Sequence, residues 1–319
     1  MKNSILLFLF LTPLFVNSQA NKLLRQGLRA DNSNEKIELF SQAIALEPKN
    51  LDAYFYRALA KNDIGDFDGA ILDYTQVLFY NPDADTYYNR GNSKFNLDDF
   101  EGAAEDYENA LKLNPELTDA LYNLGQAKFY LGDYKAAIQN FDKILKVFPE
   151  DAKTYSQRGL AHFELKNYKE AFKDFAYNIL INPDTYAYSL RGKALLDINY
   201  YKESQADFTK AIELDQKNIP CYFYLGANHL FLGEYPAAVA SFSESIKNDS
   251  LDFDAYLGLA MAQLKANDVT NAKINFRKAK SIIDPESLDN SSIAVFNNTY
   301  WYKDKYLFFN EIFKDLNAL

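Results

Sequence analysis

The sequence predicts an all-α protein in which short helical hairpins stack into an α-solenoid. The first observation is a set of five prolines that recur at intervals of 33 or 34 residues, at Pro48, Pro82, Pro115, Pro149 and Pro183. The second is a set of five glycines at the same intervals, at Gly91, Gly125, Gly159, Gly192 and Gly226. The third is an aromatic residue sixteen positions after each of these glycines. A fixed period of this length indicates a repeat architecture.

Residues 1–18 are typical of a signal peptide. Lys2 supplies a positive charge, an almost wholly apolar run covers 5–16, and small residues follow it. Cleavage is expected after Ser18 or after Ala20. The run is too short for a comfortable membrane span, and an uncleaved anchor or a buried first helix are the alternatives. We therefore expect an exported protein, in the periplasm or at the surface of a bacterial cell.

The segment 51–83 illustrates how one repeat is expected to fold. A helix is expected over 53–64, and the turn at Gly65 and Asp66 ends it, with the Asp66 side chain able to cap the next helix. In that second helix the apolar residues fall at helical spacing, at Phe67, Ala70, Ile71, Tyr74 and Leu78. An Asn-Pro pair then stops the helix. One such hairpin buries little surface alone, so neighbouring hairpins are expected to share a continuous core.

These features resemble the tetratricopeptide repeat, a helix–turn–helix unit of about 34 residues. The segment 122–149, which reads YNLGQAKFYLGDYKAAIQNFDKILKVFP, is similar to the consensus of that family. The resemblance covers about 20–285 as eight units, and it implies a right-handed superhelix whose first helices line a concave groove. The repeats are expected at about 19–50, 51–83, 84–117, 118–151, 152–184, 185–218, 219–252 and 253–285.

The remaining segment, 286–319, is expected to form a polar linker and a C-terminal helix. Residues 286–298 are polar and rich in asparagine, and 299–316 have a helical pattern with many aromatic residues. The last repeat of an array needs its outer face covered, so we expect this helix to cap the eighth repeat. The alternative is an exposed patch of Trp, Tyr and Phe that contacts a partner.

Composition and motifs argue against an enzyme and against a cofactor or metal site. The net charge of −10 disfavours nucleic acid and anionic membranes as partners. The single cysteine, Cys221, excludes a cysteine-based metal site, and His162 and His229 occupy a helix-packing position in separate repeats. There is no Gly-rich phosphate loop, no G-x-S-x-G and no H-E-x-x-H. We therefore expect no catalytic residue, no metal and no cofactor.

A second pattern predicts ion pairs inside the repeats. Four repeats carry an arginine on the first helix and an aspartate sixteen residues later on the second helix. Three other repeats have leucine at the first position and a neutral residue at the second. The matched exchange predicts structural salt bridges between the two helices, for Arg57 with Asp73, Arg90 with Asp106, Arg158 with Asp174, and Arg191 with Asp207.

The resemblance implies a partner-binding groove, and its residues can be placed on this chain. Aromatic side chains supply stiff contact area there, and amides can pair with a peptide backbone. The expected groove residues are Phe55, Tyr88, Asn89, Asn92, Phe95, Tyr122, Asn123, Gln126, Phe129, Phe163 and Phe223. Some of these rings could instead pack against a neighbouring helix. The aspartates Asp52, Asp85, Asp119 and Asp254 add a negative edge, whereas Lys153 and Lys193 are the only basic candidates.

The function expected from the sequence is that of an exported, non-enzymatic scaffold that binds a peptide or protein segment in its groove. Too few basic residues line the groove to hold acidic C-terminal tails, so neutral, apolar or basic segments fit better. The alternative is a self-associating structural component of a cell-envelope assembly that uses the C-terminal aromatic helix as its contact. Binding of a glycan on the aromatic groove is a weaker third reading. The oligomeric state is not determined by the sequence.

Overall fold

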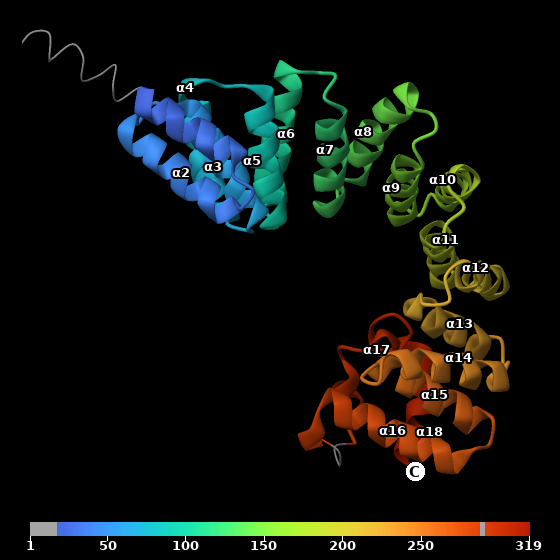
Figure 1. Ribbon diagram of the computed structural model, residues 1–319. Helices are drawn as coiled ribbons and strands as arrows, with labels where there is room; N and C mark the ends of the chain where they lie inside the picture. The colour runs from blue at the N-terminus through green and yellow to red at the C-terminus, as the bar shows by residue number, and fades with distance from the viewer. Residues whose placement is uncertain (1–17, 288–290) are drawn as a thin grey trace, which may run out of the picture. The chain divides into compact units, whose positions relative to one another are not determined.

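The computed structural model describes residues 18–287 and 291–319, and throughout these ranges the regular structure is helical (Figure 1). The chain divides into two compact units, Met1–Asn167 and Tyr168–Leu319. The predicted signal peptide lies outside the described residues, apart from Ser18.

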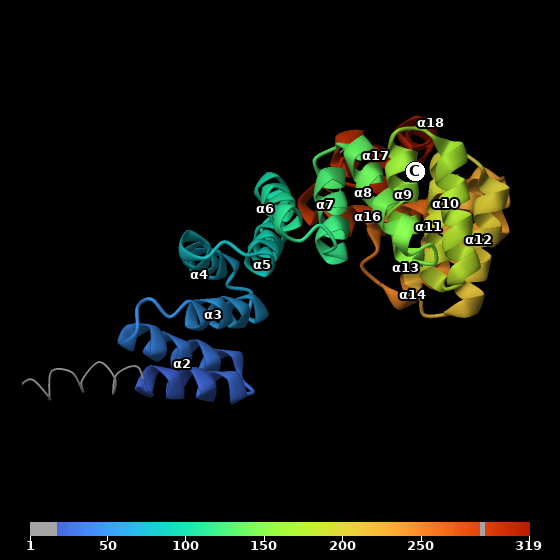
Figure 2. The ribbon, with the colours of Figure 1, turned by 90° about the horizontal axis from the view of Figure 1, so that it is seen from above.

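The first unit consists of antiparallel helical pairs that follow one another along the chain (Figure 2). A helix over 18–29 opens it. The helices that follow are α2 (Ser33–Leu46), α3 (Leu51–Asp63), α4 (Phe67–Tyr80), α5 (Ala84–Asn96), α6 (Phe100–Leu113), α7 (Thr118–Tyr130), α8 (Tyr134–Val147) and α9 (Ala152–Glu164).

The second unit continues the same pattern and ends in a different kind of segment. Its paired helices are α10 (Tyr168–Ile181), α11 (Thr185–Asp197), α12 (Tyr201–Leu214), α13 (Ile219–Phe231), α14 (Tyr235–Asn248), α15 (Phe253–Lys265) and α16 (Val269–Ile283). The C-terminal part contains η1 (Pro285–Ser287), η2 (Ile293–Phe296), α17 (Tyr300–Lys303) and α18 (Tyr306–Asn317). We call the odd-numbered helices α3 to α15 first helices and the even-numbered helices α4 to α16 second helices.

Short turns join the first and second helix of each repeat, and aspartates begin the second helices. The Asp66 carboxylate accepts a hydrogen bond from the Gly69 N–H at 3.0 Å, and Asp99 accepts one from the Gly102 N–H at 2.9 Å. These bonds satisfy amide groups that have no partner within the helix. In the turn before Asp66, Gly65 has a φ of +81°, a conformation that glycine adopts without strain.

Close approach of the paired helices explains the periodic glycines and rings. A Cβ atom added at Gly91 would lie 2.8 Å from the Tyr107 ring, and one added at Gly125 would lie 2.6 Å from the Phe141 ring. Any side chain at these glycines would collide with a buried aromatic residue. The rings that fill this place are fully or almost fully buried, at Tyr74, Tyr107, Phe141, Phe175, Phe208 and Phe242.

The first repeat is a shortened version of the others. A Cβ atom at Gly27 would lie 2.5 Å from the Phe40 ring, so this pair corresponds to Gly91 and Tyr107. Only thirteen residues separate Gly27 from Phe40, compared with sixteen in the later repeats. The turn between the two helices is therefore shorter, and the packing of ring against glycine is retained.

Within the described ranges, no helix is both long enough and apolar enough to cross a membrane.

Candidate functional site

Three of the predicted arginine–aspartate pairs are present as two-pronged ion pairs between the first and second helix. The Nη2 atoms of Arg57, Arg90 and Arg191 each lie 2.7 Å from an aspartate oxygen, of Asp73, Asp106 and Asp207 respectively. In each pair the arginine Nε also donates to the other carboxylate oxygen. All three aspartates are buried. The hydrogen bond with Asp73 raises the pKa of Arg57, and the bond with Asp207 raises that of Arg191.

The fourth predicted pair joins residues of different units and stays a prediction. Within the first unit, the Arg158 Nη1 lies 2.6 Å from the exposed carboxylate of Asp142 on α8. That contact connects α9 to the preceding second helix. Arg57 and Arg90 likewise each donate a hydrogen bond to a residue of the preceding helix.

The sequence pattern missed two further contacts of these pairs. A lysine four residues after the arginine binds the same carboxylate, because Lys61 lies 2.8 Å from Asp73 and Lys94 lies 2.8 Å from Asp106. Arg90 Nη1 also donates to the Thr75 hydroxyl of the preceding repeat at 3.0 Å. The Arg-x-x-x-Lys spacing was a signal for the second cation, since residues four apart share a helix face.

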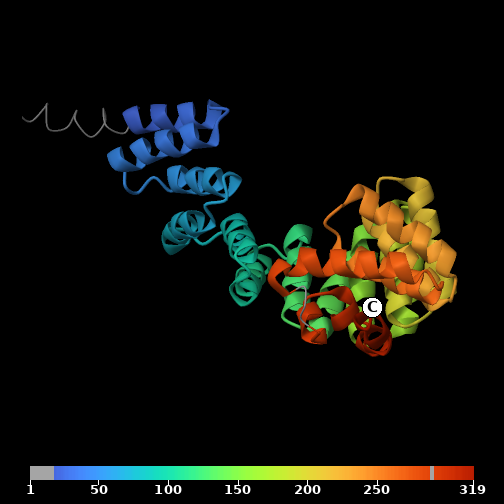
Figure 3. The same cartoon turned by 90° about the horizontal axis from the view of Figure 1, so that it is seen from below.

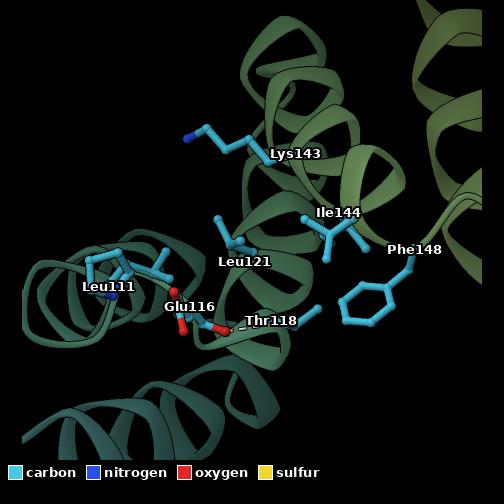
Figure 4. Close-up of a pocket in the computed structure, with 9 residues that line it drawn as sticks. Leu111, Glu116, Thr118, Leu121, Lys143, Ile144 and Phe148 are labelled. Carbon is cyan, nitrogen blue, oxygen red and sulfur yellow. Dashed lines mark hydrogen bonds between the residues drawn. The ribbon is translucent and has the colours of Figure 1, made fainter.

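Pockets lie between consecutive second helices in two repeats that lack the arginine. In the first unit a pocket of about 720 Å³ lies among α6, α7 and α8, with Leu121, Ile144 and Phe148 in its wall (Figure 4). In the second unit a pocket of about 350 Å³ is lined by Leu225 and Ser241, which replace the arginine and aspartate. In two repeats that have the arginine, its side chain bridges to the preceding helix, because Arg57 Nη1 donates to the Ser41 hydroxyl and Arg90 Nη1 to the Thr75 hydroxyl.

The groove rings predicted at the fifth residue of the first helices pack mainly into their own repeats. The centroid of the Phe55 ring lies 5.8 Å from that of Tyr74, and the Tyr88 and Tyr107 centroids lie 6.0 Å apart. The Tyr122 ring lies 5.9 Å from Phe141 in the same way. Tyr122 is 8% exposed, as is Phe223 in the second unit, whereas Phe55 and Tyr88 are half-buried. Of the four, Phe55 and Tyr88 therefore present most ring area on the surface.

The predicted groove amides connect adjacent repeats. The Asn123 Nδ2 on α7 donates to Asn92 Oδ1 on α5 at 2.9 Å, and it lies 3.5 Å from the Tyr88 hydroxyl. The Tyr107 hydroxyl also donates to Asn92 Oδ1, at 2.8 Å. These amides therefore fix the spacing of α5 and α7. The Gln126 side chain makes no hydrogen bond with any residue of the described ranges.

The remaining predicted rings lie near the C-terminal ends of the first helices. The Phe95 ring packs edge-on against Phe100 at 5.1 Å and Tyr130 at 5.6 Å, and Phe100 stacks on Tyr130 at 4.8 Å. Phe129 packs against Tyr134 at 5.2 Å. Tyr130, which was not among the predicted groove residues, is 59% exposed, whereas Phe95 and Phe100 are half-buried.

Two further predicted groove residues lie on the first helices α5 and α9. Asn89 donates its Nδ2 to the Asp85 backbone carbonyl at 2.8 Å, so it is partly used within α5. Phe163 is half-buried on α9.

Charged groups of both signs lie at the start of the first helices. Asp52, Asp85 and Asp119 are exposed in the first turns of α3, α5 and α7, and their carboxylates make no hydrogen bond or ion pair within the described ranges. At the same position of α9, the Lys153 ammonium lies 4.1 Å from the centroid of the Tyr122 ring. A cation over a ring face is attracted by the negative potential of the π-system.

In the second unit, the chain's own C-terminal segment lies against the first helices. The Asp254 carboxylate on α15 accepts a hydrogen bond from the Tyr300 N–H at 2.9 Å, and the Trp301 indole N–H donates to the Asp254 carbonyl at 2.8 Å. The Trp301 ring is fully buried, with its centroid 5.9 Å from Phe223 and 6.1 Å from Phe231. This segment therefore covers the face predicted to be a groove at Phe223.

Lys305 extends the same contact toward α11. Its Nζ donates to the Leu196 backbone carbonyl at 3.2 Å, near the end of α11, and lies 5.5 Å from the Phe231 ring centroid. A cation is favourable at a helix C-terminus because the unpaired carbonyls carry partial negative charge. Burial lowers the pKa of Lys305.

The C-terminal segment differs from the expected linker and single helix. The interval predicted as a polar linker contains η2, and Phe296 in it is fully buried. The expected helix is divided into α17 and α18 at residues 304–305. Helix α18 packs on α15 and α16 and covers the last repeat, as expected of a cap (Figure 3). Helix α17, in contrast, turns toward the first helices.

Burial gives the Asp254 carboxyl group an unusually high pKa. Removal from water raises the Asp254 pKa to about 7, and the negative charges of Asp252 and Asp304 act in the same direction. The hydrogen bonds from the Tyr300 and Trp301 backbone oppose the shift. The group therefore changes its charge near neutral pH.

The surroundings of Cys221 and His229 in the second unit indicate structural roles for both residues. Cys221 is buried, and this burial raises the pKa of its thiol to about 11, which disfavours the reactive thiolate. The His229 Nδ1 lies 2.6 Å from the Glu234 carboxylate and 3.1 Å from the Gln205 amide. Among the described residues, no group of His, Cys, Asp and Glu is arranged to hold a metal ion.

Comparisons with known proteins agree with this architecture. Models of the tetratricopeptide repeat match residues 84–117 and 118–151, 185–218, and 224–286. These segments make up just over half of the chain, and the chain therefore belongs to the tetratricopeptide repeat proteins. None of the curated proteins compared with the sequence matches it.

Solved structures of tetratricopeptide repeat proteins share the fold at low sequence identity. A tetratricopeptide repeat protein from Parabacteroides merdae is 21% identical, with a TM-score of 0.61 over 80% of this chain and 99% of that one. The C-terminal part of a repeat-containing protein from Cytophaga hutchinsonii is 19% identical, with a TM-score of 0.59 over 76% and 99%. Yeast Tom70 is 18% identical, with a TM-score of 0.55 over 94% of this chain and 64% of Tom70.

Proposed function

We propose that this protein is an exported interaction scaffold whose first unit binds a protein segment on the face formed by α3, α5 and α7. The observation that carries the proposal is the C-terminal segment of the second unit. There, the corresponding face of α11, α13 and α15 binds an aromatic helical segment through a carboxylate, a backbone carbonyl and several rings. Tetratricopeptide repeat proteins generally act as scaffolds for protein partners, and the first unit has the same elements.

The first unit offers surface suited to such a contact. Tyr88 and Phe95 are half-buried, Tyr130 is 59% exposed, and the Gln126 side chain makes no hydrogen bond within the described ranges. A partner can bury the remaining ring edges and pair its backbone with the free amide. The exposed carboxylates at the start of α5 and α7 favour a neutral or basic segment.

The alternative of self-association through the C-terminal aromatic helix has less support. Trp301 and Phe309 are fully buried within the second unit, so this aromatic face is already used by the chain itself. Leu307 is the large apolar residue of α18 that stays most exposed, at 84%. A single exposed leucine needs no partner to explain it.

Site-specific photo-crosslinking tests where a partner binds. A photoreactive amino acid is placed at Gln126, on the proposed face, and in a matched variant at Asp68, an exposed residue of the second helix α4. We expect one protein of the cell-envelope fraction to crosslink from Gln126 and not from Asp68, and to be lost when Tyr88 is changed to alanine. Equal crosslinking from both positions would contradict the proposed face.

Export is tested by the mass of the chain recovered from separated cell fractions. The proposal expects the chain outside the cytoplasm, beginning at Gln19 or Asn21 after removal of the signal peptide. An intact chain that begins at Met1 and stays in the cytoplasm would contradict it.

A further inference from the structure

We infer that Tyr88, Asp119 and Asn123 form a subsite for the N-terminal turn of a partner helix that begins with aromatic residues and carries a lysine one turn later. The inference rests on the proposed function and names the chemistry of its partner. It uses the second unit, in which a segment of this kind is bound, as an internal example of the contact.

In the second unit the contact has three parts. The side chain of Asp254, the second residue of α15, accepts the Tyr300 N–H at the start of α17. The Asp254 backbone carbonyl accepts the Trp301 indole N–H. The Trp301 ring then packs against Phe223, the fifth residue of α13. A carboxylate from one helix thus caps the N-terminus of another, which satisfies a free amide group and complements its partial positive charge.

The first unit places the same elements at the same positions. Asp119 is the second residue of α7, and Tyr88 is the fifth residue of α5. Asn123 follows Asp119 by four residues, so the two side chains share one face of α7. Because the Asn123 amide lies 3.5 Å from the Tyr88 hydroxyl, these three side chains lie at one place between α5 and α7. The Asp119 carboxylate has no partner within the described ranges and can accept a hydrogen bond.

One difference predicts a shallower contact in the first unit. Gly258 occupies the position in α15 that Asn123 occupies in α7. A Cβ atom at Gly258 would lie 2.5 Å from the Phe242 ring. Because glycine has no side chain, this ring can lie directly against α15, where it also contacts the Trp301 ring. With Asn123 in this place, a partner ring lies against the edge of Tyr88 and is not enclosed as Trp301 is.

Two contacts between a lysine and a ring within this chain are the reason for expecting a lysine in the partner. The Lys305 ammonium lies over the Phe231 ring, and the Lys153 ammonium lies over the Tyr122 ring. Both rings belong to first helices. Lys305 follows Trp301 by four residues and donates to the Leu196 carbonyl at the end of α11. With the same placement on the first unit, a lysine of the partner reaches the C-terminal end of α3, where the last backbone carbonyls carry partial negative charge.

A labelled synthetic peptide that reproduces residues 298–314 is the probe, and the full chain is the receptor. We expect saturable binding, measured by fluorescence anisotropy, with one peptide per chain. Asp119→Ala should weaken binding about five- to tenfold, the range expected from loss of a helix cap. Peptides with alanine in place of Trp301 or Lys305 should also bind more weakly. Circular dichroism of the Asp119→Ala chain checks that it is folded.

Asp52 provides the matched control. It holds the same position in α3 and is also exposed, but the preceding repeat has Leu24 where α5 has Tyr88 and α13 has Phe223. Asp52→Ala should leave binding unchanged. If Asp119→Ala binds the peptide as well as the unchanged chain, the inference is wrong. If Asp254→Ala and not Asp119→Ala weakens binding, the peptide enters the second unit, and the inference is also wrong.

The outcome is separable from that of the proposed function. A partner that crosslinks from Gln126, but that the peptide does not displace and that Asp119→Ala retains, would support the scaffold and overturn this subsite. A concentration-dependent dimer that Asp119→Ala abolishes would show a second copy of the chain as the occupant, against the separate partner inferred here. Displacement of the crosslinked partner by the peptide would support the inference.

Discussion

The indole N–H of Trp301 donates a hydrogen bond to the backbone carbonyl of Asp254, 47 residues earlier in the chain. The same aspartate caps α17 through its side chain. This relationship fixes the C-terminal segment on the first helices of the second unit. It makes the segment part of the core, because Trp301 is fully buried among Phe223, Phe231 and Phe242.

Removal of the Trp301 side chain should release this segment. Trp301→Ala creates a large cavity in the core, and such changes cost about 3–5 kcal/mol. We expect faster amide hydrogen exchange in residues 291–319 and little change in the first unit. Leu307→Ala, at an exposed position of α18, is the control and should exchange like the unchanged chain.

Docking of the C-terminal segment should depend on pH through Asp254. Its pKa in the folded chain is about 7, whereas an unfolded aspartate has a pKa of about 4. Between these values the folded state binds more protons than the unfolded state, so the stability from this group falls as pH rises from about 4 to 7 and is constant above that.

The only tryptophan of the chain, Trp301, reports this change directly. We expect its fluorescence to show tighter docking at pH 5 than at pH 8, as a higher denaturant midpoint. Asp254→Asn has no charge to gain and should reduce the difference. A midpoint in Asp254→Asn that shifts with pH as much as that of the unchanged chain would exclude Asp254 as the cause.

The arginine–aspartate pairs should show strong coupling. Arg90→Leu leaves the buried Asp106 with Lys94 as its remaining cation, and we expect a loss of about 3 kcal/mol, the low end for a broken buried pair. The double change Arg90→Leu/Asp106→Asn reproduces the natural combination of Leu124 and Asn140 and should cost about 1 kcal/mol. Urea unfolding measures both, and equal losses would show that the two residues are not coupled.

A side chain introduced at residue 258 should disturb the packing around Trp301 and leave the first unit unaffected. The Cβ atom of Gly258→Ala would lie 2.5 Å from the fully buried Phe242 ring. Overpacking of this kind costs about 1–3 kcal/mol. We expect a lower midpoint by Trp301 fluorescence and unchanged binding of a partner to the first unit. An unaltered midpoint would mean that Phe242 can move aside without loss.

Local periodicity was sufficient to predict the paired helices. The first helices α3, α5, α7, α9, α11, α13 and α15 begin at the residues that open the predicted repeats. The Arg57–Asp73 pair was visible because the exchange of both residues together recurs along one chain. Such features lie within a single repeat, where sequence distance and spatial distance agree.

Contacts between distant segments were not predictable in this way. The pattern of residues 299–316 indicated one capping helix, but Lys305 and Trp301 draw its first part onto α11, α13 and α15. The fifth residues of the first helices looked like groove residues, yet Tyr122 is almost wholly buried against Phe141. Exposure of a ring depends on neighbouring repeats, and helical spacing alone does not specify it.

The hydrogen bond between Lys305 and the Leu196 carbonyl has a consequence for how the chain folds as it is synthesised. The two residues are 109 positions apart, whereas the paired helices of each repeat contact each other locally. The repeats can form in order as they leave the ribosome, but the second unit is completed only when residues 300–305 have emerged. Until then Phe223 and Phe231 lack the Trp301 ring that covers them. A chain truncated before residue 300 would keep this aromatic surface open permanently, and we expect it to aggregate or to be retained by chaperones.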